Sequence, residues 1–400
     1  MNEFNNFTLK KRAKTFYFAS LFFPKEIRTD IETLYLFCRY VDDIGDTLNL
    51  KKRVTEDKLK RIIVDIDKLN SDELIISKLI LLFAICIFTS TDLKAQDPAF
   101  SQFYANPLYL NPAFAGAAPK GAPRTNLNYR DQWPGIGRTF ITTSVSYDKH
   151  VDKVGGGLGV LILNDRSGDG NIQLNSASLI YSYNLAVSKT FAIKAGFEAS
   201  FRMLNLDWSE LTFGDMIDQK YGFIYPTQEN IDNNPSSVQY PDFSTGFVGY
   251  TDNLYFGFAA HHLTQPEQGF ISESQLPSKF TIHAGGNFPL NKYSNNVTTL
   301  SPNFLYQSQQ DFQQFNYGLY VYRGPVVGGL WARNSVENFD AFILMVGLVQ
   351  DNFKFGYSYD ITVSNLKNSN TLGAHEISFT LYMPTKTRSK SFNTISCPQF

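Results

Sequence analysis

From about residue 123 onward, apolar and polar side chains alternate with a period of two, and turn-forming residues interrupt the pattern every ten to fifteen positions. Between 191 and 203, for example, Phe, Ile, Ala and Met alternate with Lys, Gly, Glu, Ser and Arg. A β-strand turns successive side chains to opposite faces, so the alternation predicts strands with one apolar and one polar face. Fourteen such runs are found, near 123–132, 138–149, 154–164, 171–185, 189–206, 241–251, 253–263, 278–288, 298–309, 312–323, 325–334, 340–350, 353–363 and 374–384.

The length of these runs separates two folds. Each run has about ten residues or more, whereas strands of soluble proteins most often have about five or six and a tilted strand needs roughly ten to cross a bilayer. In a soluble β-sandwich the apolar faces would form the core; in an outer-membrane barrel they face lipid, and the polar faces line the lumen. The sequence therefore predicts an all-β, transmembrane outer-membrane β-barrel of about 14 antiparallel strands over 123–385. A tyrosine-rich soluble sandwich is the alternative.

The connections between the predicted strands differ in length. The short links 251–253 and 350–352 predict tight periplasmic turns, and the segments 207–241 and 291–296 predict outward loops. A basic C-terminal tail, 386–400, follows the last strand.

Composition favours a membrane protein. Charged residues make up 18% of the chain, below the roughly 25% usual in soluble domains, while aromatic residues reach 15%. The net charge of -1 gives no basic excess that would favour nucleic acid. Cys38, Cys86 and Cys397 form no closely spaced pair, so neither a zinc site nor a disulfide framework is supported. No run of 18 apolar residues predicts a transmembrane helix.

The segment 96–122, ahead of the first predicted strand, is rich in aromatic residues and contains two Asn-Pro steps. Proline has no backbone N–H and biases the residue before it away from helix, so this segment is neither a helix nor a central strand. Its aromatic side chains still need cover. We expect it to fold against the barrel, plugging the lumen or capping its periplasmic mouth; exposed, mobile aromatics would instead indicate partner binding. The residues concerned are Phe100, Phe103, Tyr104, Asn106, Pro107, Tyr109, Asn111 and Pro112.

The segment 72–95 has the pattern of a secretory signal peptide. Lys78 precedes ten apolar residues, and a polar stretch then leads to the small residue Ala95. Ten residues of helix span only about 15 Å, too little for the roughly 30 Å hydrocarbon layer. We expect cleavage between Ala95 and Gln96, with a buried core helix as the alternative.

The first 70 residues have apolar side chains at helical spacing, and this pattern ends at an aspartate cluster. Asp42 and Asp46 lie one helical turn apart, with Asp43 beside them, a spacing that can share a divalent cation such as Mg²⁺. A solvated helix end is the alternative.

Within the strand region, several residues invite a functional interpretation. Arg130, Lys194, Glu198 and Arg202 fall on polar faces and are expected to line a charged lumen. His261 and His262 are neighbours on a strand and should point to opposite faces, which disfavours a shared metal. The glycine-rich run 155–159 lacks the spacing of a phosphate-binding loop and predicts a strand with close neighbours. No catalytic residue and no cofactor site is predicted.

Two sequence segments, Lys14–Ser20 and Leu34–Asp46, resemble the start of the squalene/phytoene synthase family. The second includes Arg39 and the aspartate cluster. The resemblance implies an Asp-rich helix that binds magnesium for a prenyl diphosphate. It covers only about residues 1–65, and no second Asp-rich helix follows. We therefore expect an inactive fragment with a vestigial metal site, and no enzyme activity.

Gln96–Gly116 resembles the opening of the PorP/SprF family, as do Asn128–Trp133, Tyr147-Asp148, His375–Ser378 and the final Cys-Pro-Gln-Phe. The resemblance covers 78–400. It implies a barrel in the bacterial outer membrane, part of the type IX secretion system of Bacteroidetes, that supports export or surface anchoring of proteins such as gliding adhesins. The implied partners are outer-membrane lipid, other secretion subunits and exported surface proteins, with no small-molecule substrate.

Two further hypotheses remain open. One is a solute channel on the same fold, and the other is a prenyl-diphosphate enzyme carried by the N-terminal segment. A signal-like segment placed after seventy residues predicts a gene fusion, a frameshift or a mis-called start, with the working protein beginning near Ser77.

Overall fold

The computed structural model describes residues 97–137, 140–168, 172–188, 190–218, 220–228, 234–290, 297–336, 338–363 and 368–384. All of them belong to the second of two units, Ala95–Phe400. Several predicted features lie outside the described residues: the helical segment 1–70 with Asp42, Asp43 and Asp46, the signal segment 72–95, the cleavage site at Ala95 and Gln96, and the tail 386–400.

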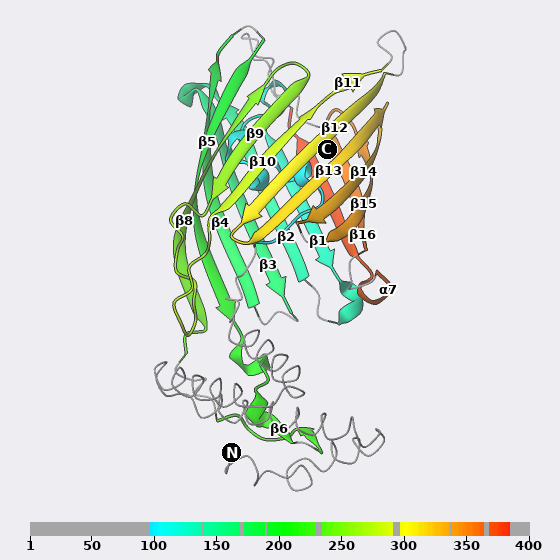
Figure 1. Ribbon diagram of the computed structural model, residues 1–400. Coiled ribbons are helices and arrows are strands. Elements are labelled where there is room, and N and C mark those ends of the chain that lie inside the picture. The colour runs from blue at the N-terminus through cyan, green and yellow to red at the C-terminus, as the bar shows by residue number, and fades with distance from the viewer. Residues whose placement is uncertain are drawn as a thin grey trace, which may run out of the picture. The chain divides into compact units, whose positions relative to one another are not determined.

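The described strands form one closed, antiparallel β-barrel (Figure 1). Its wall has fourteen strands: β1 (Arg124–Gln132), β2 (Phe140–Val151), β3 (Gly156–Ser167), β4 (Ile172–Ala186), β5 (Ala192–Leu206), β8 (Ser237–Tyr250), β9 (Leu254–His261), β10 (Lys279–Gly286), β12 (Thr298–Gln309), β13 (Phe312–Arg323), β14 (Val326–Ser335), β15 (Phe339–Val349), β16 (Phe353–Thr362) and β17 (Ala374–Tyr382). Each wall strand pairs with the next one along the chain, and β1 pairs with β17 to close the ring. Three short strands complete the set: β11 (Phe288–Pro289) beside β12, and β6 (Ile217–Asp218) paired with β7 (Gly222–Phe223).

The prediction of about fourteen antiparallel strands is confirmed, and the strand ends differ by a few residues. The largest difference at a strand start is in β8, which begins at Ser237 rather than near 241. β8 therefore continues through Pro241, although proline cannot donate to a sheet ladder. It is tolerated because β9 pairs with β8 only from Thr245 onward, so this part of β8 has a strand neighbour only on the β5 side.

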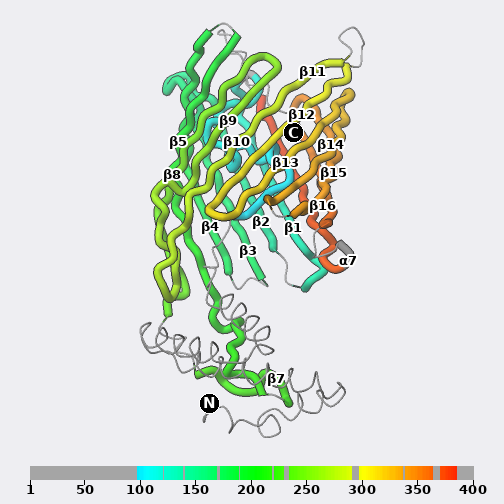
Figure 2. Tube along the Cα trace, viewed as in Figure 1, coloured from blue at the N-terminus to red at the C-terminus, as the bar shows by residue number. Residues whose placement is uncertain are grey.

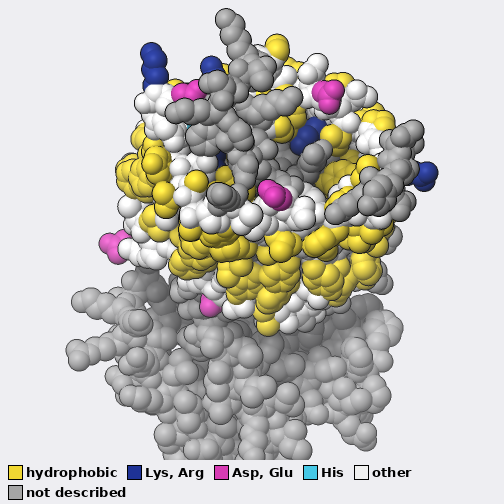
Figure 3. All heavy atoms as spheres, turned by 90° about the horizontal axis from the view of Figure 1, so that it is seen from above, with side chains coloured by type: hydrophobic (Ala, Val, Ile, Leu, Met, Phe, Trp, Pro, Cys, Tyr) yellow, Lys and Arg dark blue, Asp and Glu magenta, His cyan; other side chains and the backbone are white. Residues whose placement is uncertain are grey.

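The two faces of the wall have opposite character. Apolar side chains on the outside are largely exposed, for example Leu179 at 69%, Val346 at 60% and Ile162 at 58%. Figure 3 shows hydrophobic side chains gathered over the outer surface of the wall. The alternate positions on the same strands are buried, and over the whole wall the buried inward positions include many polar and charged side chains. This inside-out arrangement suits a wall surrounded by lipid.

The antiparallel order places the links alternately at two mouths. The turn mouth carries the short links 152–155, 187–191, 251–253 and 350–352, together with the start of β1 and the end of β17. The loop mouth, at the other end, carries the long link 207–236 between β5 and β8. The predicted outward loop 291–296 lies outside the described residues. The end of β10 before it pairs with Leu254 beside the 251–253 turn, so β10 ends at the turn mouth.

Residues 97–123, called the lumen segment below, run inside the ring of strands (Figure 2). This segment forms only short helical turns: η2 (Phe103–Ala105), α6 (Pro107–Leu110), η3 (Pro112–Phe114) and η4 (Pro119–Gly121). Proline starts three of them, because its fixed φ suits a first helical position where no N–H is required. A further short helix, α7 (Asn368–Thr371), lies between β16 and β17. Within the described residues, no helix is long and apolar enough to span a membrane.

Replacement of Leu179 by arginine tests the lipid-facing assignment. Leu179 lies at the middle of β4, whereas Leu254, also exposed, is the first residue of β9 at the turn mouth. We expect Leu179→Arg to lower the free energy of unfolding in lipid vesicles by about 2–4 kcal/mol, and Leu254→Arg by about 0–1 kcal/mol, because a charge costs most at the bilayer midplane. Denaturant titration measures both. Equal effects of the two variants would contradict a membrane centred on Leu179.

Candidate functional site

The lumen segment crosses the barrel from one mouth to the other. Asp97 contacts Arg202 and His262, which lie at the loop-mouth ends of β5 and β9. At the other end, the Gly116 N–H donates to Asp148 on β2, near the turn mouth. The chain then enters β1 from the turn mouth. The segment therefore occupies the lumen along its length before the wall begins.

The aromatic side chains of the segment supply the apolar core inside the barrel. Phe103 and Tyr104 are each 5% exposed, and their rings lie 5.4 Å and 6.3 Å from the Trp331 ring of β14. Phe100 is also buried and packs edge-on against Tyr109, which is partly buried. Full burial of one such side chain is worth about 1.5–3 kcal/mol. The core of this fold therefore lies between the segment and the wall.

The two Asn-Pro steps bind the segment to the wall. Asn106 donates from its side chain to Ser144 of β2 at 2.8 Å, and Pro107 then starts α6. Asn111 accepts from the Ala113 N–H at 2.9 Å, which caps η3. Its amide also donates to the backbone carbonyls of Phe247 at 3.2 Å and Phe258 at 3.1 Å, on β8 and β9. One side chain thus fixes the turn and holds two strands.

Three wall glycines make room for this part of the segment. A Cβ atom on Gly157 would lie 2.1 Å from the Ala115 carbonyl oxygen, and one on Gly196 would lie 2.3 Å from the Ala113 nitrogen. On Gly246 it would lie 2.3 Å from the Asn111 side-chain oxygen. The close neighbour of the glycine-rich run 155–159 is therefore the backbone of the lumen segment.

A cluster of buried polar side chains surrounds Ser101. Its members come from β1, β14, β16 and β17. The Ser101 N–H donates to Glu376 at 2.6 Å, and its hydroxyl donates to Asp360 at 2.6 Å. Arg130 and Arg333 pair with the same Asp360 carboxylate at 3.0 Å and 2.9 Å. Sequence reasoning singled out Arg130 but not Arg333, Asp360 or Glu376 as site residues. All three lie on the polar faces of their strands, which was the available signal.

The three β5 residues expected in the lumen point inward and are buried: Lys194 at 3%, Glu198 at 7% and Arg202 at 8% exposed. The Lys194 ammonium donates to the Ala115 carbonyl at 2.6 Å. Arg202 binds Asp97 at 3.2 Å, and Glu198 borders a cavity beside it. Two of the three therefore contact the lumen segment directly, at opposite ends.

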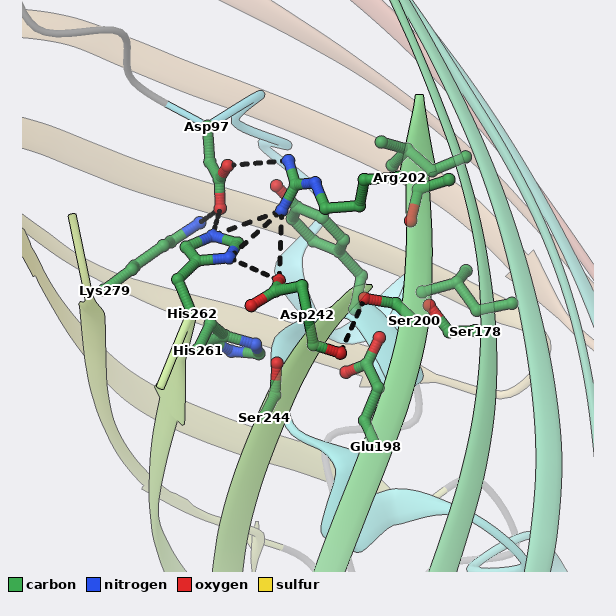
Figure 4. A pocket seen from close by; sticks show the side chains of 14 residues that line it. Asp97, Ser178, Glu198, Ser200, Arg202, Asp242, Ser244, His261, His262 and Lys279 are labelled. Atoms are coloured by element: carbon green, nitrogen blue, oxygen red, sulfur yellow. Dashed lines mark hydrogen bonds and ion pairs between the residues drawn. The ribbon is translucent and has the colours of Figure 1, made fainter. Parts of the chain in front are cut away.

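The first residue of the segment, Asp97, sits in a group of charges that we call the Asp97 cluster (Figure 4). Its carboxylate lies 2.6 Å from His262 Nε2, 3.2 Å from Arg202 Nη2 and 3.8 Å from Lys279 Nζ. The other ring nitrogen of His262, Nδ1, lies 2.6 Å from Asp242. The imidazole therefore joins a carboxylate of the segment to a carboxylate of β8.

The prediction that His261 and His262 point to opposite faces is wrong, since both line the same cavity. β9 ends at His261, and His262 adopts a left-handed φ of 56°, which breaks the alternation of a strand. Across the described part of the chain, no group of three or more His, Cys, Asp or Glu side chains is placed to hold a metal ion.

The cavity beside the Asp97 cluster has a volume of about 40 Å³. Serines from three strands and Glu198 form its polar lining, with Leu161 and Leu163 on its apolar side. A water needs roughly 10–15 Å³ of such volume, so the cavity can hold about three or four waters. The lining serines are Ser176, Ser178, Ser200 and Ser244.

The Asp97 cluster shifts the pKa of its two groups outside the strands. Burial alone would raise the pKa of the Asp97 carboxyl, but the charges of His262 and Arg202 hold it well below its usual range. Burial alone would lower the pKa of His262, but Asp97 and Asp242 raise it above its usual value. His261, Arg202, Lys279, Glu198 and Tyr109 are the other titratable or charged groups that line the cavity with the imidazole. The contact is therefore held by a carboxylate and an imidazolium.

Substitution of Gly196 tests the fit between segment and wall. In Gly196→Ala the new Cβ would collide with backbone at Ala113, so we expect the segment to shift at a cost of about 1–3 kcal/mol. Ion conductance of the barrel in planar bilayers should rise. Gly328→Ala on β14 is the matched control, because a Cβ there meets no atom within 4 Å. A conductance rise shared by both variants would contradict a specific fit.

The pH dependence of the contact between Asp97 and His262 follows from the pKa shifts of these two groups. Because the pKa of His262 is raised, its protonated form stabilises the folded protein. This contribution to stability is complete below pH 6.5, the unfolded pKa, and is lost as the pH rises through the folded pKa. The lowered pKa of Asp97 gives a contribution present above 3.8 and lost as pH falls through the folded value. We therefore expect conductance to rise when the pH is changed from about 6 to about 9.

His262→Gln should remove that alkaline response, because glutamine does not titrate. His150→Gln, which changes a histidine paired with Asp152 at the turn mouth, should retain it. Equal responses of the two variants would show that another group controls the change.

Two family models match the chain. The model of the type IX secretion system membrane protein PorP/SprF matches residues 92–381. The squalene/phytoene synthase model matches residues 9–105, somewhat further than the similarity noted over 1–65. Two unrelated families in one chain support a gene fusion. A search of curated proteins finds no match.

The solved structures that resemble this chain in fold are bacterial outer-membrane proteins. The toluene transporter TbuX of Ralstonia pickettii shares 10% identity and a TM-score of 0.41 over 69% of this chain and 93% of that one. The KdgM porin shares 8% identity and a TM-score of 0.33 over 65% and 99%. A porin mutant of Rh. blastica shares 8% identity and a TM-score of 0.28 over 66% and 99%. These scores are too low to carry any functional comparison.

The family assignment rests on the matched sequence and on the barrel seen in the same residues. The match over 92–381 includes the lumen segment and thirteen complete wall strands, and ends one residue before β17 does. It covers more than half of the chain. The chain belongs to the PorP/SprF family of type IX secretion system membrane proteins, and its place is the bacterial outer membrane.

Proposed function

We propose that this protein is a non-enzymatic barrel of the type IX secretion system that supports export or surface anchoring of secreted proteins such as gliding adhesins, and that its lumen segment acts as a plug. The observation that carries the proposal is the position of the family's signature stretch. The residues that resemble the family's opening, 96–116, overlap the part of the lumen segment that contacts the wall most extensively.

Contacts with strands all around the ring favour a plug over a flexible linker. Ser101 contacts β16 and β17, Asn106 contacts β2, and Asn111 contacts β8 and β9. Ala115 then accepts hydrogen bonds from β4 and β5 through Ser182 and Lys194. A segment held on so many sides leaves little open lumen, and the cavity of about 40 Å³ agrees with that.

The plug assignment also bears on a solute-channel role. A channel needs a continuous water-filled path, whereas this lumen is occupied by apolar side chains such as Leu108 and Phe114, both at most 1% exposed. Passage would require displacement of the segment. We therefore propose that the barrel serves a secretion complex rather than steady diffusion of solutes.

We also propose that the squalene/phytoene synthase-like segment is without activity and that the mature protein begins at Gln96. The Asp42, Asp43 and Asp46 cluster has no second Asp-rich helix after it in the sequence. The apolar stretch and small residue before Gln96 are those of a cleaved signal. N-terminal peptide mapping of the native protein measures the second point directly.

Gene deletion with complementation tests the secretory role. We expect deletion to remove a set of proteins from the cell surface and the medium, measured by mass spectrometry, and residues 78–400 to restore them. Asp42→Ala in the full chain is the matched control and should restore them equally. An unchanged surface proteome together with lost solute uptake would favour the channel instead. Prenyl-diphosphate turnover that Asp42→Ala abolishes would favour the enzyme.

A further inference from the structure

Three cationic side chains, two from wall strands and His262 from just after β9, converge on one carboxylate at the loop mouth. Arg202 contacts one oxygen of Asp97, while His262 and Lys279 approach the other, at 3.2, 2.6 and 3.8 Å. All three are more than nine-tenths buried, with exposures of 8%, 2% and 7%. Figure 4 shows the three side chains arranged around the carboxylate, which comes from outside the wall.

The wall does not balance these charges by itself. Asp242 contacts Arg202 at 3.6 Å and His262 at 2.6 Å, and it is the wall carboxylate paired with them. For Lys279, Asp97 is the anionic partner recorded in the described residues. If Asp97 leaves, Arg202, His262 and Lys279 keep Asp242 and Glu198 as the wall carboxyl groups of the same cavity, so three cationic groups face two carboxyl groups. Such an imbalance is costly and favours uptake of an anion.

The geometry selects the class of anion. Donors reach both oxygens of one planar group, which is the shape of a carboxylate. Asp242 stands behind His262, and its negative charge disfavours a doubly charged group such as a phosphate. The adjoining cavity of about 40 Å³, lined by serines, offers polar space beside the carboxylate.

The position of Asp97 makes exchange possible. It is the end of the lumen segment at the loop mouth, whereas the Asn106 and Asn111 contacts lie deeper in the barrel. The carboxylate can therefore leave while the deeper contacts remain. Its replacement by another carboxylate would remove one of the contacts that hold the segment in the lumen.

We propose that Arg202, His262 and Lys279 form a carboxylate-binding site at the loop mouth, which Asp97 occupies in the resting protein and which a carboxylate of an exported polypeptide occupies when the segment is released. The identity of that polypeptide rests on the secretory role proposed above. The site itself does not, because its donors and geometry belong to this chain.

Chemical rescue tests the site. Asp97→Ala removes one carboxylate from the cluster, so the variant should conduct severalfold more than wild type in planar bilayers and should unfold at a lower temperature in detergent. Millimolar acetate, a small carboxylate, should raise that unfolding midpoint by occupying the vacated site, without closing the barrel. Acetamide, which has the same shape without the charge, and chloride at equal ionic strength should not. If acetate, acetamide and chloride act alike, the proposal is overturned.

Three further variants define the result. Asn106→Ala removes another contact between segment and wall, to Ser144, without leaving an anion-sized hole, so its unfolding midpoint should not respond to acetate. Addition of Arg202→Gln to Asp97→Ala should abolish the acetate effect. Asp97→Asn is the matched control, and acetate should leave its midpoint unchanged because the amide fills the hole.

Peptides distinguish the source of the carboxylate. Two short peptides are added separately to wild-type barrels. The first has a free C-terminal carboxylate and no acidic side chain. The second has the C-terminus blocked as an amide and contains one internal aspartate. If only the first peptide raises the conductance, the site binds chain termini. If only the second raises it, the site binds acidic side chains. Opening by neither at concentrations where acetate stabilises Asp97→Ala would overturn the exchange. Failure of these assays leaves the secretion assay to decide the proposed function separately.

Discussion

Closure of the sheet into a ring constrains everything else in this protein. A ring turns every second side chain inward, and in this wall those positions carry arginine, lysine, aspartate and glutamate. Charges that are buried away from water need partners. Part of that need is met within the wall, where Arg130 pairs with Asp360 and Glu376. The remainder is met by the lumen segment, through Asp97 at one end and the Ala115 carbonyl at the other.

The lumen segment therefore has two different attachments. Its middle is held by wall glycines, buried aromatic rings and the Asn111 amide, and the neutral groups of Ser101 and Gly116 donate hydrogen bonds to wall carboxylates. Its first residue is held by charge, between His262, Arg202 and Lys279. Packing contacts respond little to pH or to competing ions, whereas a charged contact responds to both. Regulation of the segment is therefore expected to act at Asp97.

The direction of the segment has a topological consequence. Asp97 lies at the loop mouth, while β1 starts and β17 ends at the turn mouth. Residues 97–123 therefore run along the lumen in the direction opposite to β1, and the chain reverses at the turn mouth before the wall begins.

Local chemistry in the sequence determined the strands and their two faces. Period-two alternation over ten or more residues has one physical cause, the pleat of the strand, so all fourteen wall strands and the inward positions of Lys194, Glu198 and Arg202 could be predicted. The Asn-Pro steps likewise excluded a ladder strand for 96–122, because proline lacks the required N–H.

Tertiary structure decided which residues meet. Arg130 and Glu376 are 246 positions apart, and Asp97 and His262 are 165 apart, so only closure of the ring brings them together. The two histidines depart from alternation because β9 stops at His261, and the mouth at which β10 ends depends on the order of all the strands before it. Local periodicity carries no information about either. The sequence by itself determined the wall and its polar lining, and the closed ring decided which charges face the lumen segment.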